Sequence, residues 1–152
     1  MSYVLLFIFP FLFLSSCQDI PSKYKTPEGK KILEKYKKQY VKGVVLIDEK
    51  LKDKLPGGDK FLIISVRKPD KARPVAVLRV KNPDFPYRFK ITGKNKINPD
   101  DFIEGNLILM ARLSKEPTAG FKQGDLYGVA QGKAGQENVK IVINQIFEGS
   151  GK

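Results

Sequence analysis

FLIISVRKPDKARPVAVLR, residues 61–79, contains two short apolar runs separated by a polar connection that includes Pro69 and Pro74. Both runs are rich in β-branched residues and are bounded by turn formers, which favours strands over helices. Proline cannot donate to a hydrogen-bond ladder, so both prolines suit the ends of strands. Because each run is almost continuously apolar, the stretch predicts a two-stranded hairpin at the centre of a sheet.

Further short runs follow the same pattern through the rest of the chain after residue 43, with turn signals about every 8–12 residues. The expected strands are 44–47, 61–66, 75–80, 87–92, 107–111, 126–130 and 139–147, with one helical turn at 48–55. We therefore expect an all-β domain over residues 43–148. It should be an immunoglobulin-like antiparallel β-sandwich of seven or eight strands, with a small closed barrel as the alternative architecture. Residues 149–152 should form a flexible tail.

The composition points to anionic partners and away from the common catalytic chemistries. The 152 residues include 28 Lys and Arg against 16 Asp and Glu, a net charge of +12. Such a surface attracts acidic proteins, lipid headgroups or nucleic acid. There is no histidine, which removes the commonest metal ligand and the commonest acid–base catalyst. The sequence has a single cysteine. We expect no enzyme activity, no metal site and no cofactor.

Residues 1–16 have the pattern of a secretory signal. The apolar run 4–14 is too short to span a bilayer, which takes about 20 residues, but it fits the apolar region of a signal peptide. Leu14-Ser15-Ser16-Cys17 follows and resembles a bacterial lipobox. The resemblance implies cleavage before Cys17, lipidation of its thiol and an extracytoplasmic protein anchored to a bacterial membrane. The alternative is a fortuitous cysteine after a plain signal or membrane anchor.

Residues 17–42 should form a linker and one short basic helix. Thr26-Pro27-Glu28 is a helix start, and the helix is expected to end near Val41. Residues 23–42 hold eight lysines and two glutamates. A narrow apolar stripe is expected at helical spacing, made of Ile32, Leu33, Tyr36 and Tyr40. Two interpretations remain open: the stripe packs on the domain, or the helix contacts anionic lipid.

No catalytic or nucleic-acid-binding constellation emerges from the remaining polar residues. Ser65 and Ser114 have no histidine to act as a base. Asp100 and Asp101 are adjacent, and neighbours on an extended chain point to opposite faces. Residues 87–90 (YRFK) interleave basic and aromatic side chains, as nucleic-acid-binding proteins do. The extracytoplasmic address and the expected burial of Phe89 argue against a nucleic-acid partner.

Several short motifs, in this order, resemble the C-terminal periplasmic domain of the cytochrome c maturation factor CcmI, also called CycH. They are FLIISVR (61–67), PVAVLR (74–79), DFPYRF (84–89), ARLSK (111–115) and GDLYG (124–128). The resemblance is collinear over about residues 43–147. It implies an immunoglobulin-like fold, an extracytoplasmic address and a protein partner in cytochrome c assembly.

The residues that we expect to contact a partner are Arg67, Arg79, Arg112, Asp125 and Tyr127. Arg67 and Arg79 are either caps that face water at strand ends or a basic pair aimed at one surface. The arginines could instead form salt bridges with Asp125 or another acid, and the glycines of 124–128 could serve a tight turn. The expected function is non-catalytic assistance in cytochrome c maturation through protein contacts. The alternative is a structural envelope lipoprotein that binds anionic lipid or polymer.

Overall fold

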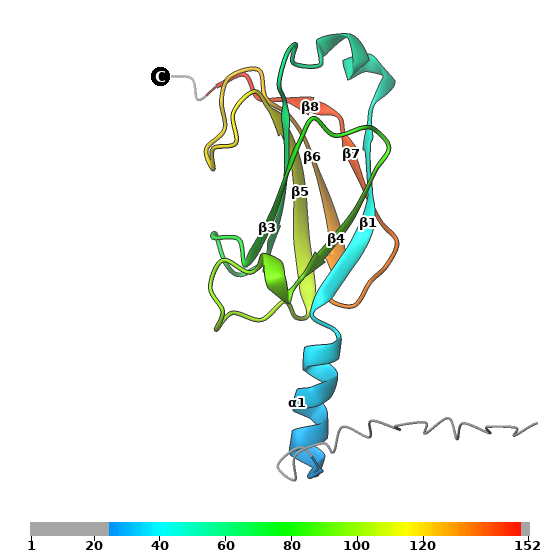
Figure 1. The fold of residues 1–152 in the computed structure, drawn as a ribbon, viewed down its shortest axis with the longest axis vertical. Helices are drawn as coiled ribbons and strands as arrows, with labels where there is room; N and C mark the ends of the chain where they lie inside the picture. The colour runs from blue at the N-terminus through cyan, green and yellow to red at the C-terminus, as the bar shows by residue number, and fades with distance from the viewer. Residues whose placement is uncertain (1–24, 150–152) are drawn as a thin grey trace, which may run out of the picture.

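Two β-sheets pack face to face in the computed structural model, which describes residues 25–149 (Figure 1). One sheet has five strands in the order β3-β2-β5-β6-β8, and the other has three in the order β4-β1-β7. The strands are β1 (Tyr40–Ile47), β2 (Phe61–Arg67), β3 (Ala76–Lys81), β4 (Tyr87–Thr92), β5 (Asn106–Ser114), β6 (Leu126–Lys133), β7 (Val139–Ile143) and β8 (Gln145–Ile146). The expected β-sandwich of seven or eight strands is confirmed.

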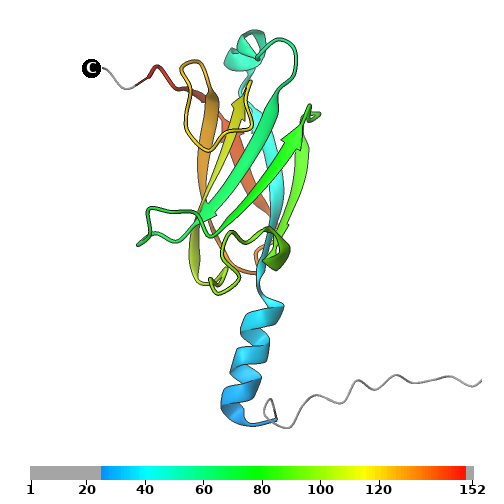
Figure 2. The ribbon, with the colours of Figure 1, turned by 60° about the vertical axis from the view of Figure 1, so that its left-hand side comes forward.

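Three helical segments accompany the strands. They are the α-helix α1 (Pro27–Lys37) and the short 3-10 helices η2 (Glu49–Lys54) and η3 (Gly93–Asn95). In two views α1 extends from one end of the sandwich, whereas η2 lies at the opposite end (Figures 1 and 2). Cys17 and the signal-like residues 1–16 lie outside the described residues.

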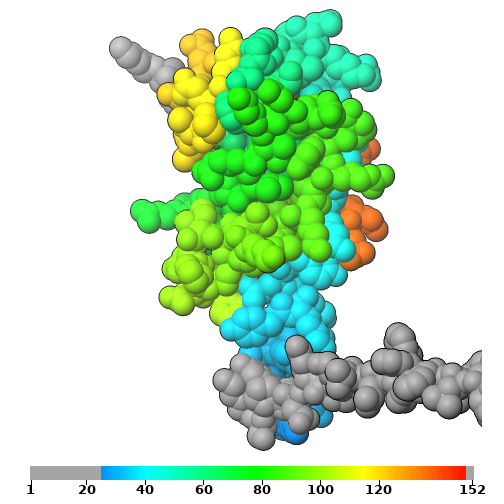
Figure 3. Space-filling model, in the orientation of Figure 1, coloured from blue at the N-terminus to red at the C-terminus, as the bar shows by residue number. Residues whose placement is uncertain are grey.

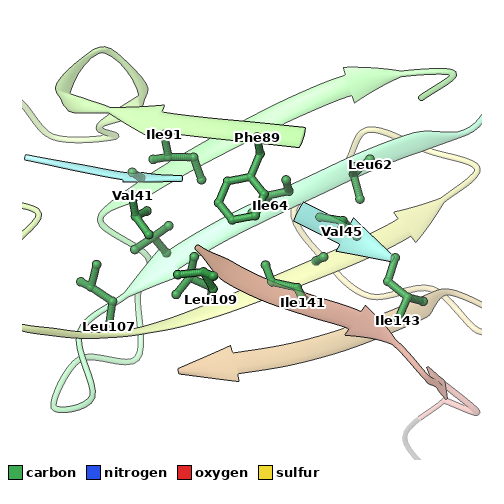
Figure 4. Packing of buried hydrophobic residues seen from close by; sticks show 14 of the residues in the cluster. Val41, Val45, Leu62, Ile64, Phe89, Ile91, Leu107, Leu109, Ile141 and Ile143 are labelled. Carbon is green, nitrogen blue, oxygen red and sulfur yellow. The ribbon is translucent and has the colours of Figure 1, made fainter. Parts of the chain in front are cut away.

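The core lies between the two sheets and follows the period-two alternation of the strands (Figure 4). Ile64 and Leu109 point inward from the five-stranded sheet, and Val45, Phe89 and Ile141 point inward from the other. All five are buried, as expected for Phe89 in particular. Each strand therefore has an opposite face turned away from the core, and the outer face of the five-stranded sheet carries the candidate site.

The hairpin of residues 61–79 was wrongly expected to lie wholly at the centre of its sheet. β2 is central, with β3 on one side and β5 on the other, but β3 is the edge strand. β3 is apolar because its inward-facing side chains contact the core, and not because both of its faces are buried. Leu78 and Val80 are partly buried there, and Arg79 is exposed on the opposite face.

The strand pairing departs from the fully antiparallel expectation at one place. β1 and β7 run parallel, with Gly43 opposite Val139 and Ile47 opposite Ile143. A parallel pair cannot be joined by a hairpin turn, so its two strands are distant in sequence. The pattern of neighbouring apolar runs in the sequence carries no signal for such a contact.

The last apolar run also divides where one strand was expected. β7 belongs to the three-stranded sheet, and β8 pairs with β6 in the five-stranded sheet. At the break, the Asn144 N–H donates to the Tyr127 carbonyl at 3.1 Å. The chain thus passes from one sheet to the other, close to the loop that precedes β6.

α1 begins where the sequence predicts, with the Thr26 hydroxyl accepting from the Gly29 N–H at 3.0 Å. It ends at Lys37 rather than near Val41, because β1 already begins at Tyr40. Val41 is fully buried in the core. Burial of a β-branched side chain in a sheet outweighs the modest helix propensity of this segment.

Candidate functional site

Register aligns the predicted arginines on the outer face of the five-stranded sheet. Ile63 on β2 lies opposite Arg79 on β3 and opposite Arg112 on β5. These three residues therefore form one row across three neighbouring strands. Arg67 lies on the same face of β2, because it is four residues beyond Ile63 and side chains alternate along a strand.

The three arginines line one hollow on this face. Its volume is about 250 Å³, and its apolar lining comes from the sheet and from the connecting loops. The apolar residues include Ile63, Val77, Ile97, Met110 and Phe121. The loop of residues 115–125 (yellow, upper left) and the β2–β3 connection (green, middle left) stand out along this side of the molecule (Figure 3).

Arg112 binds the loop of residues 115–125 through several hydrogen bonds. Its guanidinium donates to the Asp125 carboxylate at 2.9 Å and to the main-chain carbonyls of Thr118 and Gly120. It also lies 5.1 Å from the centre of the Phe121 ring. The interpretation of Arg112 as a salt-bridge partner of Asp125 is confirmed, although the pair is buried rather than on the sheet surface.

Asp125 and Tyr127 support the hollow without lining it. One oxygen of Asp125 accepts from both Arg112 and the Lys122 N–H, each at 2.9 Å. Tyr127 meets the Phe121 ring edge-on, with 5.2 Å between ring centres. The nearby Gly124 has φ +88°, so the tight-turn interpretation applies to this glycine. These residues thus set the position of the wall that contains Phe121.

Arg67 and Arg79 differ from Arg112 because no carboxylate in residues 25–149 forms an ion pair with either. Arg67 is partly exposed and donates to the Lys71 carbonyl at 3.4 Å, and Arg79 is exposed in the middle of β3. A guanidinium presents planar donors that suit carboxylate or phosphate groups. The hollow therefore combines an apolar floor with two cationic groups that have no carboxylate partner within residues 25–149.

Sequence reasoning found the arginines but missed the apolar residues beside them. Met110 could have been placed from the alternation of β5, which puts it on the same face as Arg112. Phe121 stands alone in a polar, glycine-containing loop, a weak signal for an aromatic group folded back onto the sheet. Ile97 is exposed and lies outside the strands, so strand periodicity does not place it.

A second feature is the junction between α1 and the sandwich. Glu104 forms ion pairs with Lys35 of α1 and, at 2.7 Å, with Lys68 after β2. The pKa of Glu104 is lowered by hydrogen bonds from Lys35, which has the larger effect, and from Lys68. Tyr36 contacts the Phe102 ring edge-on, at 5.3 Å between centres. These contacts hold the last turns of the helix against the domain.

Part of the helix stripe remains exposed to solvent. Ile32 and Tyr36 keep 46% and 51% of their surface exposed. Packing of the stripe on the domain is therefore only partial. Within residues 25–149, no helix is both long and apolar enough to cross a membrane.

The sequence profile of one family, the cytochrome c-type biogenesis protein H Ig-like domain, matches residues 41–144. The chain belongs to this family. The matched residues include β1 except Tyr40, all of β2 to β7, and all the lining residues of the arginine hollow. The resemblance that the five motifs indicated is thereby confirmed at the level of the Ig-like domain.

Two other proteins share similarity with this chain. A protein of Aquifex aeolicus, described as uncharacterized, is 71% identical over 143 residues, which cover 94% of this chain and 95% of the relative. The structure of an alternative pilotin from the type II secretion system of Vibrio cholerae has a TM-score of 0.42 and 9% sequence identity. It aligns with 70% of this chain and 97% of the pilotin.

Proposed function

We propose that this protein is a non-catalytic, membrane-tethered lipoprotein that assists cytochrome c maturation through contacts with another protein. The family match of residues 41–144 carries the link with cytochrome c biogenesis. Within the matched domain, Arg67 and Arg79 provide charged groups for a partner, and Phe121 and Met110 provide apolar contact area.

Binding explains the chemistry of the hollow better than catalysis does. An arginine guanidinium stays protonated, so it can hold an anion but cannot exchange protons during a reaction. The third arginine, Arg112, uses its donors on Asp125 and on loop carbonyls. The whole sequence contains no histidine. The proposal includes no cofactor, no metal and no nucleic-acid partner.

The proposed tether rests on the lipobox-like residues 14–17, with Cys17 as the lipidated residue. This arrangement gives an extracytoplasmic protein held at a bacterial membrane. α1 extends from one end of the sandwich, away from η2 (Figure 2). A tether that enters at α1 therefore leaves the arginine hollow on the side of the domain, where a partner can reach it.

The decisive test is recovery of partners from membranes. Full-length tagged protein should co-purify with a haem-ligation component or an apocytochrome c. The double variant Arg67→Gln/Arg79→Gln should recover at least several-fold less. Arg88→Gln/Lys90→Gln removes the same charge from β4 in the other sheet and serves as the control. If wild-type protein recovers none of these components, the cytochrome assignment is wrong and the Ig-like family assignment stands alone.

Contact with anionic lipid or envelope polymer is the second candidate function. The observation that favours it is the exposed side of α1, where Ile32 and Tyr36 lie among lysines. A lipid-free form that begins at Thr26 should bind anionic vesicles, most strongly at low salt, because screening is then weakest. Replacing four lysines by Gln should weaken this binding: Lys30, Lys31, Lys37 and Lys38. Equal binding to neutral and anionic vesicles would rule out the electrostatic contact.

A further inference from the structure

Next to the arginine hollow, β3 has a main-chain edge with which no strand of residues 25–149 pairs beyond an isolated bridge at Ala76. The Asn82 N–H donates to the Lys60 carbonyl at 2.8 Å, which marks these two residues as a hydrogen-bonded pair at the end of the β2–β3 ladder. Antiparallel pairs alternate between hydrogen-bonded and non-hydrogen-bonded. Val80 therefore turns its main-chain groups toward β2. Arg79 and Lys81 turn theirs outward, to the open side of the sheet.

On that side, the main-chain pairing within residues 25–149 lies at the start of β3. An isolated bridge links Ala76 with Lys96, and the Ile97 N–H donates to the Val75 carbonyl at 3.0 Å. No strand in residues 25–149 pairs with β3 beyond this point. An open edge of this kind is a template for another extended chain.

The positive charge of Arg79 on this edge favours an acidic partner strand. A strand added beside β3 would place alternate side chains on the outer face, next to Arg79 and within reach of the hollow that contains Arg67. Neither arginine has a carboxylate partner in the described structure. A second copy of this chain fits poorly, because two β3 edges would bring Arg79 against like charge in molecules of net charge +12.

On the inward face of this edge, an added strand would need apolar side chains. Leu78 and Val80 are only partly buried and pack against the core cluster from the rim of the sandwich. Apolar side chains on the inward face of an added strand would cover their exposed remainder. The edge as a whole therefore matches an extended segment in which acidic and apolar residues alternate.

We propose that β3 binds such an alternating acidic and apolar segment of a partner protein by strand addition. The main chain of the segment bonds to the outward N–H and C=O groups of Arg79 and Lys81. Its outward-facing carboxylates contact Arg79. This proposal rests on the proposed function in one respect, since it specifies how a partner protein is held.

The probe is an end-blocked octapeptide of alternating glutamate and valine, added to the full-length lipidated protein in neutral detergent micelles. Hydrogen exchange of the main-chain amides is the readout. The peptide should slow exchange at Arg79 and Lys81, because their N–H groups become donors to a new strand. An alternating lysine and valine peptide should need at least about tenfold higher concentration for the same protection.

Two variants separate strand addition from general attraction of an acidic peptide to a basic protein. Arg79→Gln should weaken peptide binding several-fold. Arg88→Gln makes an equal change of charge at an exposed position on β4, and its affinity for the peptide should stay within about twofold of wild type. Equal losses in both variants would overturn the proposal. So would equal protection by a block peptide of four glutamates followed by four valines, because a block sequence cannot alternate its side chains across the edge.

This experiment fails or succeeds independently of the membrane recovery test. If the peptide leaves Arg79 and Lys81 unprotected while cytochrome assembly components still co-purify, the β3 edge is wrong and the proposed function remains. If the peptide protects the edge but no such component is recovered, the edge is a peptide site in a protein with another role.

Discussion

The Arg112 guanidinium donates to the Asp125 carboxylate at 2.9 Å, and the two side chains keep only 3% and 4% of their surface exposed. Among the ion pairs within residues 25–149, no other has both side chains buried. The pair joins β5 to the start of β6. Through the carbonyls of Thr118 and Gly120, Arg112 also fixes the loop that carries Phe121 into the hollow.

Breaking this pair should destabilise the fold strongly. Arg112→Met leaves the Asp125 carboxylate buried without its counter-ion, which should cost about 3–5 kcal/mol in the free energy of unfolding. The double variant Arg112→Met/Asp125→Leu should regain part of that loss, because no unpaired charge remains. Urea unfolding measures both. Lys122→Gln, which removes an exposed pair with Glu116, is the control and should change stability by about 0.5 kcal/mol or less. Similar losses in Arg112→Met and the control would contradict this role.

Gly128 allows the two sheets to approach closely. A Cβ at this position would lie 1.9 Å from the Val142 carbonyl oxygen, and main-chain atoms cannot move aside as a side chain can. Gly128→Ala should therefore cost about 3 kcal/mol or more, at the upper end of overpacking effects. Gly57→Ala is the matched control, because nothing lies within 4 Å of its Cβ position. Thermal unfolding of both variants tests this, and equal midpoints would show that β6 and β7 can separate without penalty.

Glu104 should make the attachment of α1 dependent on pH. Its pKa is lowered by hydrogen bonds from Lys35 and Lys68, so the folded state holds this proton less tightly than the unfolded state. The stabilisation is therefore present above the ordinary value of 4.5 and is lost as pH falls through the lower folded value.

Glu104→Gln tests this direction. At pH 7 the variant should be less stable than wild type by about 1 kcal/mol or less, because the ion pairs are partly exposed. The difference should shrink as the pH falls through the lowered folded pKa of Glu104, because the wild-type carboxyl then becomes protonated and loses its ion pairs. Glu148→Gln, an exposed position outside the strands, is the control. A difference that grows toward acid pH would reverse the assignment.

Cys17→Ser tests the lipidation site, which lies outside the described residues. The thiol is the acylation site of a lipobox, so the variant should lose the mass of the acyl chains and accumulate as uncleaved precursor. The sandwich should be unaffected, because its core residues begin at Val41. Mass spectrometry of the membrane fraction and circular dichroism measure the two outcomes. A wild-type protein that carries no acyl mass and starts elsewhere than Cys17 would end the lipoprotein hypothesis.

The sequence by itself determined the strand segments, the helix start at Thr26 and the family resemblance. These features are local. Alternation along β5 depends only on consecutive residues, and the helix cap at Thr26 needs only the next three. Strand periodicity also assigns Arg67 and Ile63 to the same side of β2, but aligning Arg79 and Arg112 with them requires the register between strands.

The tertiary structure alone decided which strands are neighbours and which arginines are free. The parallel contact of β1 with β7, the edge position of β3 and the transfer of the chain from β7 to β8 depend on hydrogen bonds between distant segments. Arg112 is neutralised because the turn before β6 brings Asp125 to within 2.9 Å. Arg79 has a similar sequence context but lies on an exposed edge, where no carboxylate of the described residues pairs with it. A guanidinium becomes structural or available to a ligand according to what packs beside it, and that is a property of the folded chain.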